Sequence, residues 1–442
     1  MEILSSTNGV SPRTPVITGI GITSPFGLGK RAFFDGIRHG RSGLGGITLF
    51  EPNGLKSRVV GEVKGLDPSA YFDKAELNRV PRIVPVAVSA AKEAFEDAGL
   101  DLAAMTEDQK REVNVIVGTG AGGIDFAERQ YAHYFKGEGR RATPYAVSSS
   151  FVGMLSSEIS IYFGLRGMTH VISTGCTSST DAIGYASRAI KHGEADLVLT
   201  GGAEACITPG IMAGFDRMQV TSTRFNDTPA RASRPFNADR DGFVLGEGAW
   251  IFVLESYERA KRRGAKHYAF VRGYGSTCDA YHRVLMLPDG IEPARAMKLA
   301  LADAKLEPEQ VDYVNLHGTS TQLNDEVETR AVKRVFDARA YAIPMSGTKS
   351  MIGHPQGACG AAGLAASLLA LNAGIVPPTV SYEVPDPKCD LNYVPNRAVA
   401  KDTAWVLANC LAFGSKNSSL VLERADRNAR ELLSESDRAD AR

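Results

Sequence analysis

The stretch Val171-Ile-Ser-Thr-Gly-Cys-Thr-Ser-Ser-Thr-Asp-Ala predicts a strand that turns sharply into a helix, with Cys176 at the turn. The free N–H groups and the positive dipole end of a helix N-terminus favour a thiolate. A sharp strand-to-helix turn also exposes the side chain at its apex. Cys176 is therefore a candidate nucleophile, although its position alone leaves open that it is a small buried packing residue.

A similar order of elements returns about 200 residues later, which indicates a domain duplication. The helical stretches AKEAFEDAGLD (91–101) and MKLALADAKLE (297–307) each precede an apolar strand that ends in a Gly-containing turn. Helix starts at Cys176 and Gly357 extend the parallel, and the seam falls near Glu255 to Lys266. Strands that alternate with helices predict an α/β fold, with a largely parallel sheet covered on both faces.

Length and composition limit the functions to consider. The 442 residues allow two or three domains, and 43% hydrophobic with 23% charged residues exclude a disordered chain. Lys+Arg and Asp+Glu both number 50, which argues against a general nucleic-acid or membrane-surface binder. The six Cys form no CxxC pair and the first 12 residues lack an apolar signal segment, so we expect a cytoplasmic protein without a metal or disulfide framework.

One long segment is free of charge. No Asp, Glu, Lys or Arg occurs from Met351 up to Glu383, a length that could span a bilayer. The segment contains His354, Gln356 and Asn372, and its apolar residues are mostly Ala and Gly. A buried helix of a water-soluble protein is the better interpretation.

Two histidines lie at the ends of segments in the second half. His317 follows the strand that starts at Val311, and His354 lies in Gly347-Thr-Lys-Ser-Met-Ile-Gly-His-Pro-Gln-Gly. The carboxyl ends of strands form the site in open α/β sheets, so a catalytic place is reasonable for both. A structural role remains the alternative for either histidine taken alone.

At these residues the chain resembles a known family. Cys176, His317 and His354 resemble the Cys-His-His triad of β-ketoacyl-acyl-carrier-protein synthases, which are condensing enzymes of the thiolase-like superfamily. The likeness runs from Val16 to Leu422 and includes Ser233-Arg-Pro-Phe-Asn-Ala-Asp-Arg-Asp-Gly-Phe-Val-Leu-Gly-Glu-Gly-Ala. It implies a layered αβαβα fold built from two duplicated mixed-sheet halves.

The resemblance implies domains at 1–260, with the nucleophile, and 261–425, with both histidines. Residues 426–442 are highly charged, and we expect them to form a disordered tail.

Finer motifs point inside the family. Ser173-Thr-Gly-Cys-Thr-Ser, Asp279-Ala-Tyr-His and Asp386-Pro-Lys-Cys-Asp-Leu-Asn-Tyr-Val-Pro resemble the ketosynthase alpha subunit of type II polyketide synthases. Fatty-acid elongation synthases of the second type share several of these motifs. The implied reaction is a decarboxylative Claisen condensation of malonyl carrier protein with an acyl chain held on Cys176.

The resemblance also assigns supporting roles. His317 and His354 would stabilise the enolate, Lys349 would orient the site, and Phe413 would gate it and contribute a backbone N–H to the oxyanion hole. Thr319 and Thr321 would contact the phosphopantetheine arm, and Glu328 would act as a structural or ion-supporting carboxylate. No metal or separate cofactor is implied, because phosphopantetheine arrives on the carrier protein.

The C-terminal loop departs from the family pattern. The family usually reads close to Gly-Phe-Gly-Gly-Thr-Asn, whereas this chain reads Ala412-Phe-Gly-Ser-Lys-Asn. Ala, Ser and Lys replace residues that let the loop flex or adopt a positive φ. This change puts inferences about chain length and gating in doubt, and Lys416 is a functional residue or a solvent-facing one.

Three other functions compete with this hypothesis. A thiolase needs a second Cys in the C-terminal Gly-rich loop, and none lies between Phe413 and Ser419. A non-catalytic chain-length factor lacks the nucleophilic Cys, and a fatty-acid synthase would act as a homodimer. The implied partners are an acyl carrier protein and a second ketosynthase-like subunit, identical or a chain-length factor.

Overall fold

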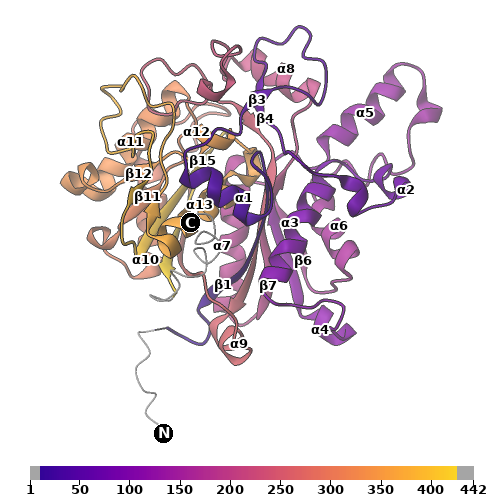
Figure 1. Ribbon diagram of the computed structural model, residues 1–442, viewed down its shortest axis with the longest axis horizontal. Coiled ribbons are helices and arrows are strands. Elements are labelled where there is room, and N and C mark those ends of the chain that lie inside the picture. Colours follow the sequence, from indigo (N-terminus) through magenta and orange to yellow (C-terminus); the bar gives the residue numbers. More distant parts are fainter. Residues whose placement is uncertain (1–9, 426–442) are drawn as a thin grey trace, which may run out of the picture.

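The two predicted halves appear as a repeated strand order in one sheet (Figure 1). In the computed structural model, which describes residues 10–425, the order is β6-β5-β7-β9-β1-β10-β16-β15-β11-β12. If the five strands of each half are numbered 1 to 5 along the chain, both halves have the order 3-2-4-5-1 from the outer edge inward. The first strands of the two halves, β1 and β10, therefore meet at the centre of the sheet. The strands are β1 (Pro15–Ser24), β5 (Val113–Gly118), β6 (Thr169–Ile172), β7 (Leu197–Glu204), β9 (Gly248–Ser256), β10 (Ala269–Cys278), β11 (Tyr313–Asn315), β12 (Met345–Ser346), β15 (Trp405–Ala412) and β16 (Lys416–Arg424).

The prediction of a largely parallel sheet is wrong for the middle of the molecule. β5 runs parallel to β6 and β7, and β11 runs parallel to β12 and β15. The pairs around β9, β1, β10 and β16 are all antiparallel. An apolar strand pattern reports burial and not direction, so the sequence could not distinguish the two arrangements. Shorter strands lie outside this order: β2 (Gly27–Leu28), β3 (Gly45–Gly46), β4 (Val59–Gly61), β8 (Leu245–Gly246), β13 (Ile375–Val376) and β14 (Val399–Ala400).

Helices form three layers around and between the two halves of the sheet. α3 and α6 cover the outer face of the first half, α10 and α11 cover that of the second, and α7 and α13 lie between them. This arrangement gives the αβαβα layers of the thiolase-like fold. The helices are α1 (Lys30–Arg38), α2 (Lys74–Leu77), α3 (Ile83–Asp97), α4 (Glu107–Arg111), α5 (Ile124–Phe135), α6 (Met154–Phe163), α7 (Ser178–Lys191), α8 (Pro209–Met218), α9 (Tyr257–Arg262), α10 (Ile291–Ala304), α11 (Gln322–Phe336), α12 (Lys349–Ile352) and α13 (Cys359–Ala373).

The outer helices pack on glycines at equivalent places in the two halves. A Cβ on Gly21 of β1 would collide with the carbonyl of Ala90 in α3. A Cβ on Gly275 of β10 would collide with the carbonyl of Ala296 in α10 in the same way. This repeated close approach of helix backbone to strand backbone is physical evidence for the duplication.

The charge-free segment forms the central helix α13. Its residues 359–372 are all buried, which confirms the prediction of a buried helix. In the part of the chain from 10 to 425, no helix is long and apolar enough to cross a membrane. The predicted charged tail, 426–442, lies outside the described residues.

The first turns of α7 and α13 touch each other directly. The backbone N–H of Ala361 donates a hydrogen bond of 2.9 Å to the Ser179 hydroxyl. A Cβ on Gly360 would lie 2.9 Å from the backbone nitrogen of Thr180 and would collide with its hydroxyl. This contact joins the helix start that follows Cys176 to the one that follows His354.

We predict that Gly360→Ala destabilises the protein by about 1–3 kcal/mol, because the added methyl group forces the two helix starts apart. Urea unfolding followed by circular dichroism measures the change. The control is Gly214→Ala in α8, where nothing lies within 4 Å of the added Cβ. That variant gains helix propensity worth roughly 0.5–1 kcal/mol. Equal stability of the two variants would contradict the packing argument.

Candidate active site

Cys176 lies in a short 3-10 turn, Gly175–Thr177, between β6 and α7, as the strand-turn-helix pattern predicts. Gly175 has a φ of +74°, which makes the turn sharp. The Cys176 side chain is only 4% exposed, and its thiol donates to the Gln356 amide oxygen over 3.8 Å. The turn therefore places the thiol in a buried site and not at an open surface.

Burial raises the pKa of the Cys176 thiol, whereas a helix N-terminus acts to lower it. The pKa of Cys176 is raised to about 12, mainly because burial disfavours the charged form. The backbone N–H of Phe413 and the charge of Lys349 favour the thiolate but do not outweigh burial. The helix N-terminus favours a thiolate, but burial has the larger effect on Cys176 and favours the protonated thiol.

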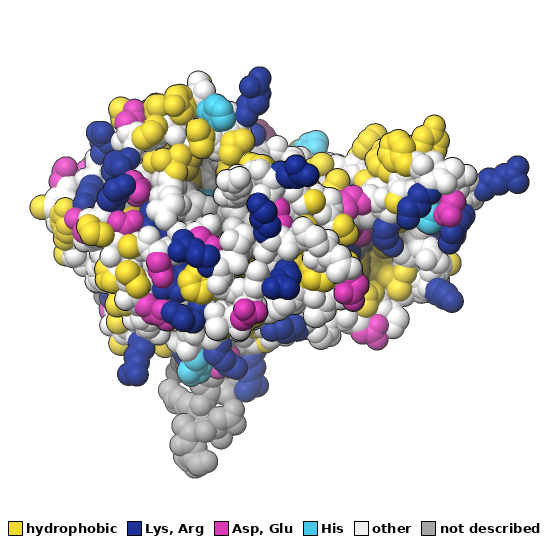
Figure 2. All heavy atoms as spheres, turned by 90° about the horizontal axis from the view of Figure 1, so that it is seen from above, with side chains coloured by type: hydrophobic (Ala, Val, Ile, Leu, Met, Phe, Trp, Pro, Cys, Tyr) yellow, Lys and Arg dark blue, Asp and Glu magenta, His cyan; other side chains and the backbone are white. Residues whose placement is uncertain are grey.

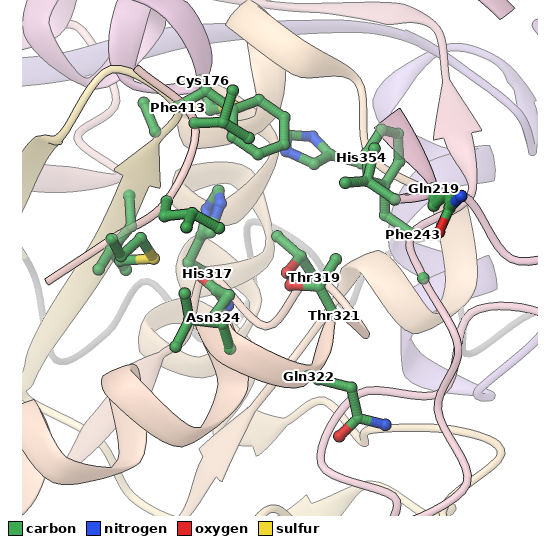
Figure 3. Close-up of a pocket in the computed structure, with 18 of the residues that line it drawn as sticks. Cys176, Gln219, Phe243, His317, Thr319, Thr321, Gln322, Asn324, His354 and Phe413 are labelled. Carbon is green, nitrogen blue, oxygen red and sulfur yellow. Dashed lines mark hydrogen bonds between the residues drawn. The ribbon is translucent and has the colours of Figure 1, made fainter. Parts of the chain in front are cut away.

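His317 and His354 converge on this thiol from two loops of the second half. His317 follows β11 and His354 follows α12. Their ring centroids are 5.3 Å apart and the rings are nearly perpendicular, at 85°. One ligand atom from each of Cys176, His317 and His354 lies within 4.8 Å of the others, and Figure 3 shows all three around one cavity.

Both imidazoles are held in the neutral form. Burial, followed by the nearby charge of Lys349, lowers the pKa of His317 to about 3. Burial also lowers the pKa of His354. A neutral imidazole keeps one N–H to donate and one nitrogen to accept, so the pair can stabilise an oxyanion or take up a proton.

Lys349 fixes the orientation of His317. Its ammonium group donates to the His317 carbonyl over 2.6 Å and lies 3.2 Å from His317 Nδ1. An ammonium group has only donors, so Nδ1 accepts and the ring proton is on Nε2. The same charge beside Nδ1 disfavours a metal cation at this nitrogen.

Two buried carboxylates shape the loop that carries His317. Glu328 of α11 accepts the N–H groups of His317 and Gly318 over 2.7 and 2.8 Å. Burial raises the pKa of Glu328 to about 7. Asp325 accepts the Thr319 N–H over 3.1 Å. The contacts of Glu328 fit the predicted supporting role.

A cavity of about 230 Å³ leads to the thiol. It contains the predicted substrate-binding and gating residues together with the triad: Cys176, His317, Thr319, Thr321, His354 and Phe413. The hydroxyls of Thr319 and Thr321 are 2.9 Å apart on one wall (Figure 3). The side chains of Phe243 and Asn324, to which the family motifs assigned no site role, also line this cavity.

The unusual C-terminal loop keeps a left-handed backbone at Ser415, although serine replaces a family glycine there. Gly414 has a φ of +78° and Ser415 one of +64°, which is a strained value for a residue with a Cβ. The Ser415 hydroxyl donates to the His282 carbonyl over 3.0 Å and so anchors the loop. Lys416 begins β16, pairs with Ala412 and does not line the cavity.

Two further cysteines touch the nucleophile's backbone. The thiols of Cys359 and Cys410 both donate to the Cys176 carbonyl, over 3.2 and 3.0 Å. Their sulfurs are 3.4 Å apart. Cys359 lies at the second helix start, but nothing in its local sequence indicated the contact with Cys410.

Comparisons with known proteins agree with this geometry. Residues 14–260 match the β-ketoacyl synthase N-terminal domain, and residues 268–383 match its C-terminal domain. A putative polyketide β-ketoacyl synthase 1 of Streptomyces cyaneus is 42% identical, over 93% of this chain and 98% of its own. A 3-oxoacyl-[acyl-carrier-protein] synthase 2 of Synechocystis is 40% identical, over 92% of this chain and 97% of its own.

Two solved structures are similar over nearly their whole length. One is a type II polyketide synthase acyl-carrier protein in complex with its ketosynthase bound to the hexaketide, with a TM-score of 0.85, 32% identity and coverage of 94% and 100% of the two chains. The other, the ishigamide ketosynthase/chain length factor, has a TM-score of 0.85, 34% identity and the same coverage. The thiol, the paired histidines and the duplicated fold thus agree with both comparisons, and the chain belongs to the β-ketoacyl synthase family.

Proposed function

We propose that this chain is the ketosynthase alpha subunit of a type II polyketide synthase, which joins an acyl chain on Cys176 to malonyl carrier protein. The observation that carries the proposal is the meeting of one buried thiol with two neutral imidazoles in a single cavity. Thioester exchange needs the thiol, and malonyl decarboxylation needs donors for a developing enolate.

In the first step the acyl chain moves from the phosphopantetheine sulfur to the sulfur of Cys176. The new C–S bond forms as the old one breaks, and the Cys176 proton passes to the departing pantetheine thiol. A neutral imidazole nitrogen can hold that proton in transit. The backbone N–H groups of Cys176 and Phe413 would stabilise the tetrahedral oxyanion.

In the second step the malonyl C–C bond breaks, carbon dioxide leaves, and its electron pair forms an enolate. N–H groups of His317 and His354 stabilise the enolate oxygen. The enolate carbon then attacks the acyl carbonyl on Cys176, a C–C bond forms, and the C–S bond breaks. The released Cys176 sulfur takes up a proton, and the free thiol is restored.

Phosphopantetheine arrives with the carrier protein, so the reaction as proposed uses no separate cofactor. Thr319 and Thr321 line the cavity where the arm would extend. The six cysteines are free, and five of them are buried. Free thiols fit the reducing cytoplasm, where we place the enzyme.

An exposed apolar surface supports a dimer. Figure 2 shows hydrophobic side chains gathered on the lobe that holds α5 and α6. Large exposed residues there include Tyr134, Phe135, Val147, Phe151 and Ile161, with Phe135 being 81% exposed. The edge strand β6 lies in the same half. Apolar patches beside an open sheet edge are typical of subunit interfaces.

The second candidate is a homodimeric fatty-acid elongation synthase, which the 40% identity to the Synechocystis protein favours. Native mass spectrometry after incubation with acyl carrier protein separates the two candidates. The proposal expects the Cys176 adduct in a one-to-one heterodimer with a co-expressed chain-length-factor-like subunit. An adduct in a homodimer supports the fatty-acid alternative, and no adduct in either form contradicts both.

We predict that Cys176→Ala abolishes condensation without unfolding the chain, because it removes the nucleophile and little volume. Intact-mass analysis after incubation with acyl carrier protein detects the adduct. Cys278→Ala, at an exposed cysteine, is the matched control and keeps the adduct. Chain extension by Cys176→Ala near the wild-type rate would refute the assignment.

We predict that His317→Ala or His354→Ala slows carbon dioxide release from malonyl carrier protein by about 10²–10³-fold, as loss of an oxyanion donor does in other enzymes. The release of labelled carbon dioxide from labelled malonyl carrier protein measures this rate directly. Unchanged release from the double variant would remove both residues from the mechanism.

The histidines should also stay neutral well below neutral pH. The pKa of His317, about 3, lies below the ordinary value of 6.5, so the folded protein binds fewer protons than the unfolded chain between these values. The contribution of this histidine to stability is therefore complete above pH 6.5 and is lost as the pH falls towards 3. Ring ¹⁵N shifts in labelled protein should remain those of neutral imidazole at about pH 5. A titration midpoint of His317 above pH 6 would contradict this prediction.

A further inference from the structure

A buried amide lies beside the nucleophile and takes no part in the mechanism above. Gln356 is 9% exposed, and its amide oxygen accepts the Cys176 thiol proton over 3.8 Å. Its φ of +34° is in the left-handed region, where a residue with a Cβ is strained. Strain of this kind persists only where the surrounding structure imposes it.

The nitrogen of the Gln356 amide has no hydrogen-bond partner within residues 10–425. Among residues 10–425, no group accepts a hydrogen bond from the Gln356 amide nitrogen, although that atom is fully buried. A buried donor without an acceptor is costly, and native proteins rarely leave one. The free N–H group points to an acceptor that arrives with the substrate.

The backbone around Gln356 holds the amide in place. The next residue, Gly357, donates its N–H to Glu204 over 2.9 Å, and Gly120 donates to the same carboxylate oxygen over 2.7 Å. A Cβ on Gly357 would collide with the backbone nitrogen of Gly120. The buried helix α13 follows directly, so the loop has little freedom to turn the amide elsewhere.

Gln356 is absent from the lining of the cavity that contains Thr319 and Thr321. It lies in the short turn Gln356–Ala358 before α13, which packs against β7, and its amide oxygen contacts the Cys176 sulfur. A substrate whose pantetheine arm passes the two threonines would therefore meet Gln356 only beyond the sulfur. The part of the substrate beyond the sulfur is the acyl chain.

Acylation of Cys176 leaves both polar atoms of the Gln356 amide without a hydrogen-bond partner among residues 10–425. A thioester sulfur has no proton, so the Gln356 oxygen loses the one donor that it has in the free enzyme. A saturated acyl chain offers the amide nothing in return. An oxygen on the third carbon, four bonds from the sulfur, can accept from the amide nitrogen, and a hydroxyl there can also donate to the amide oxygen.

We propose that Gln356 is a specificity residue that selects acyl chains oxygenated at the third carbon, of which the 3-oxoacyl chain is the form the enzyme elongates. The inference rests on the proposed function, because it names the substrate class of the same thiol. It gives the amide a partner in the acyl-enzyme and accounts for a strained, buried polar residue beside the nucleophile.

The test compares two donors of equal length, butanoyl-pantetheine and 3-oxobutanoyl-pantetheine thioesters. Intact-mass spectrometry follows the rate of Cys176 acylation in wild type, Gln356→Leu and Gln322→Leu. Gln322 lies at the end of the Cys176 cavity that is far from the thiol (Figure 3), so it is a matched glutamine-to-leucine control. The ratio of the two rates within each protein cancels any general loss of activity.

We expect Gln356→Leu to lower the 3-oxobutanoyl-to-butanoyl ratio by about tenfold or more, since one buried hydrogen bond is lost. Gln322→Leu should keep the wild-type ratio. Acylation of Gln356→Leu by both donors at the wild-type ratio would overturn the inference and leave the proposed function standing. Failure of wild type to accept either donor would overturn both.

Discussion

The whole active site depends on the contact between the first turns of α7 and α13. Gly360 lies against Thr180, and the Ala361 N–H reaches the Ser179 hydroxyl. Cys176 ends the loop before one helix and Gln356 the loop before the other, so this contact sets the distance between groups from opposite halves. Any side chain at position 360 would separate the thiol from the loop that carries His354.

Burial at this contact decides the chemistry of the site. It raises the pKa of Cys176 and lowers that of His317, so the resting site holds a thiol and neutral imidazoles and no separated ion pair. Burial keeps His317 neutral, and the charge of Lys349, which also binds the His317 carbonyl, adds to this effect. Such a site can accept a malonyl carboxylate, whose electron pair passes to the enolate as neutral carbon dioxide leaves.

Much of this arrangement could be predicted from the sequence, for a physical reason. Cys176 and His317 follow strands directly, and strand ends converge in α/β folds, so local pattern is enough to find them. The contacts of Cys359 and Cys410 with the Cys176 carbonyl could not be predicted, because they require α13 and β15 to dock from far along the chain. The raised pKa of Cys176 could not be predicted either, since depth of burial is a property of the folded whole.

The division of the catalytic triad between the two halves has a consequence for biosynthesis. β1 and β10 pair only through Val16 with Phe270 and Ile17 with Ala269, and all imidazoles of the triad come from the second half. During translation the N-terminal half emerges first and carries a thiol with no means of decarboxylating malonyl groups. A nascent chain on the ribosome therefore cannot waste malonyl units, and catalytic competence arises only when synthesis of the second half is complete.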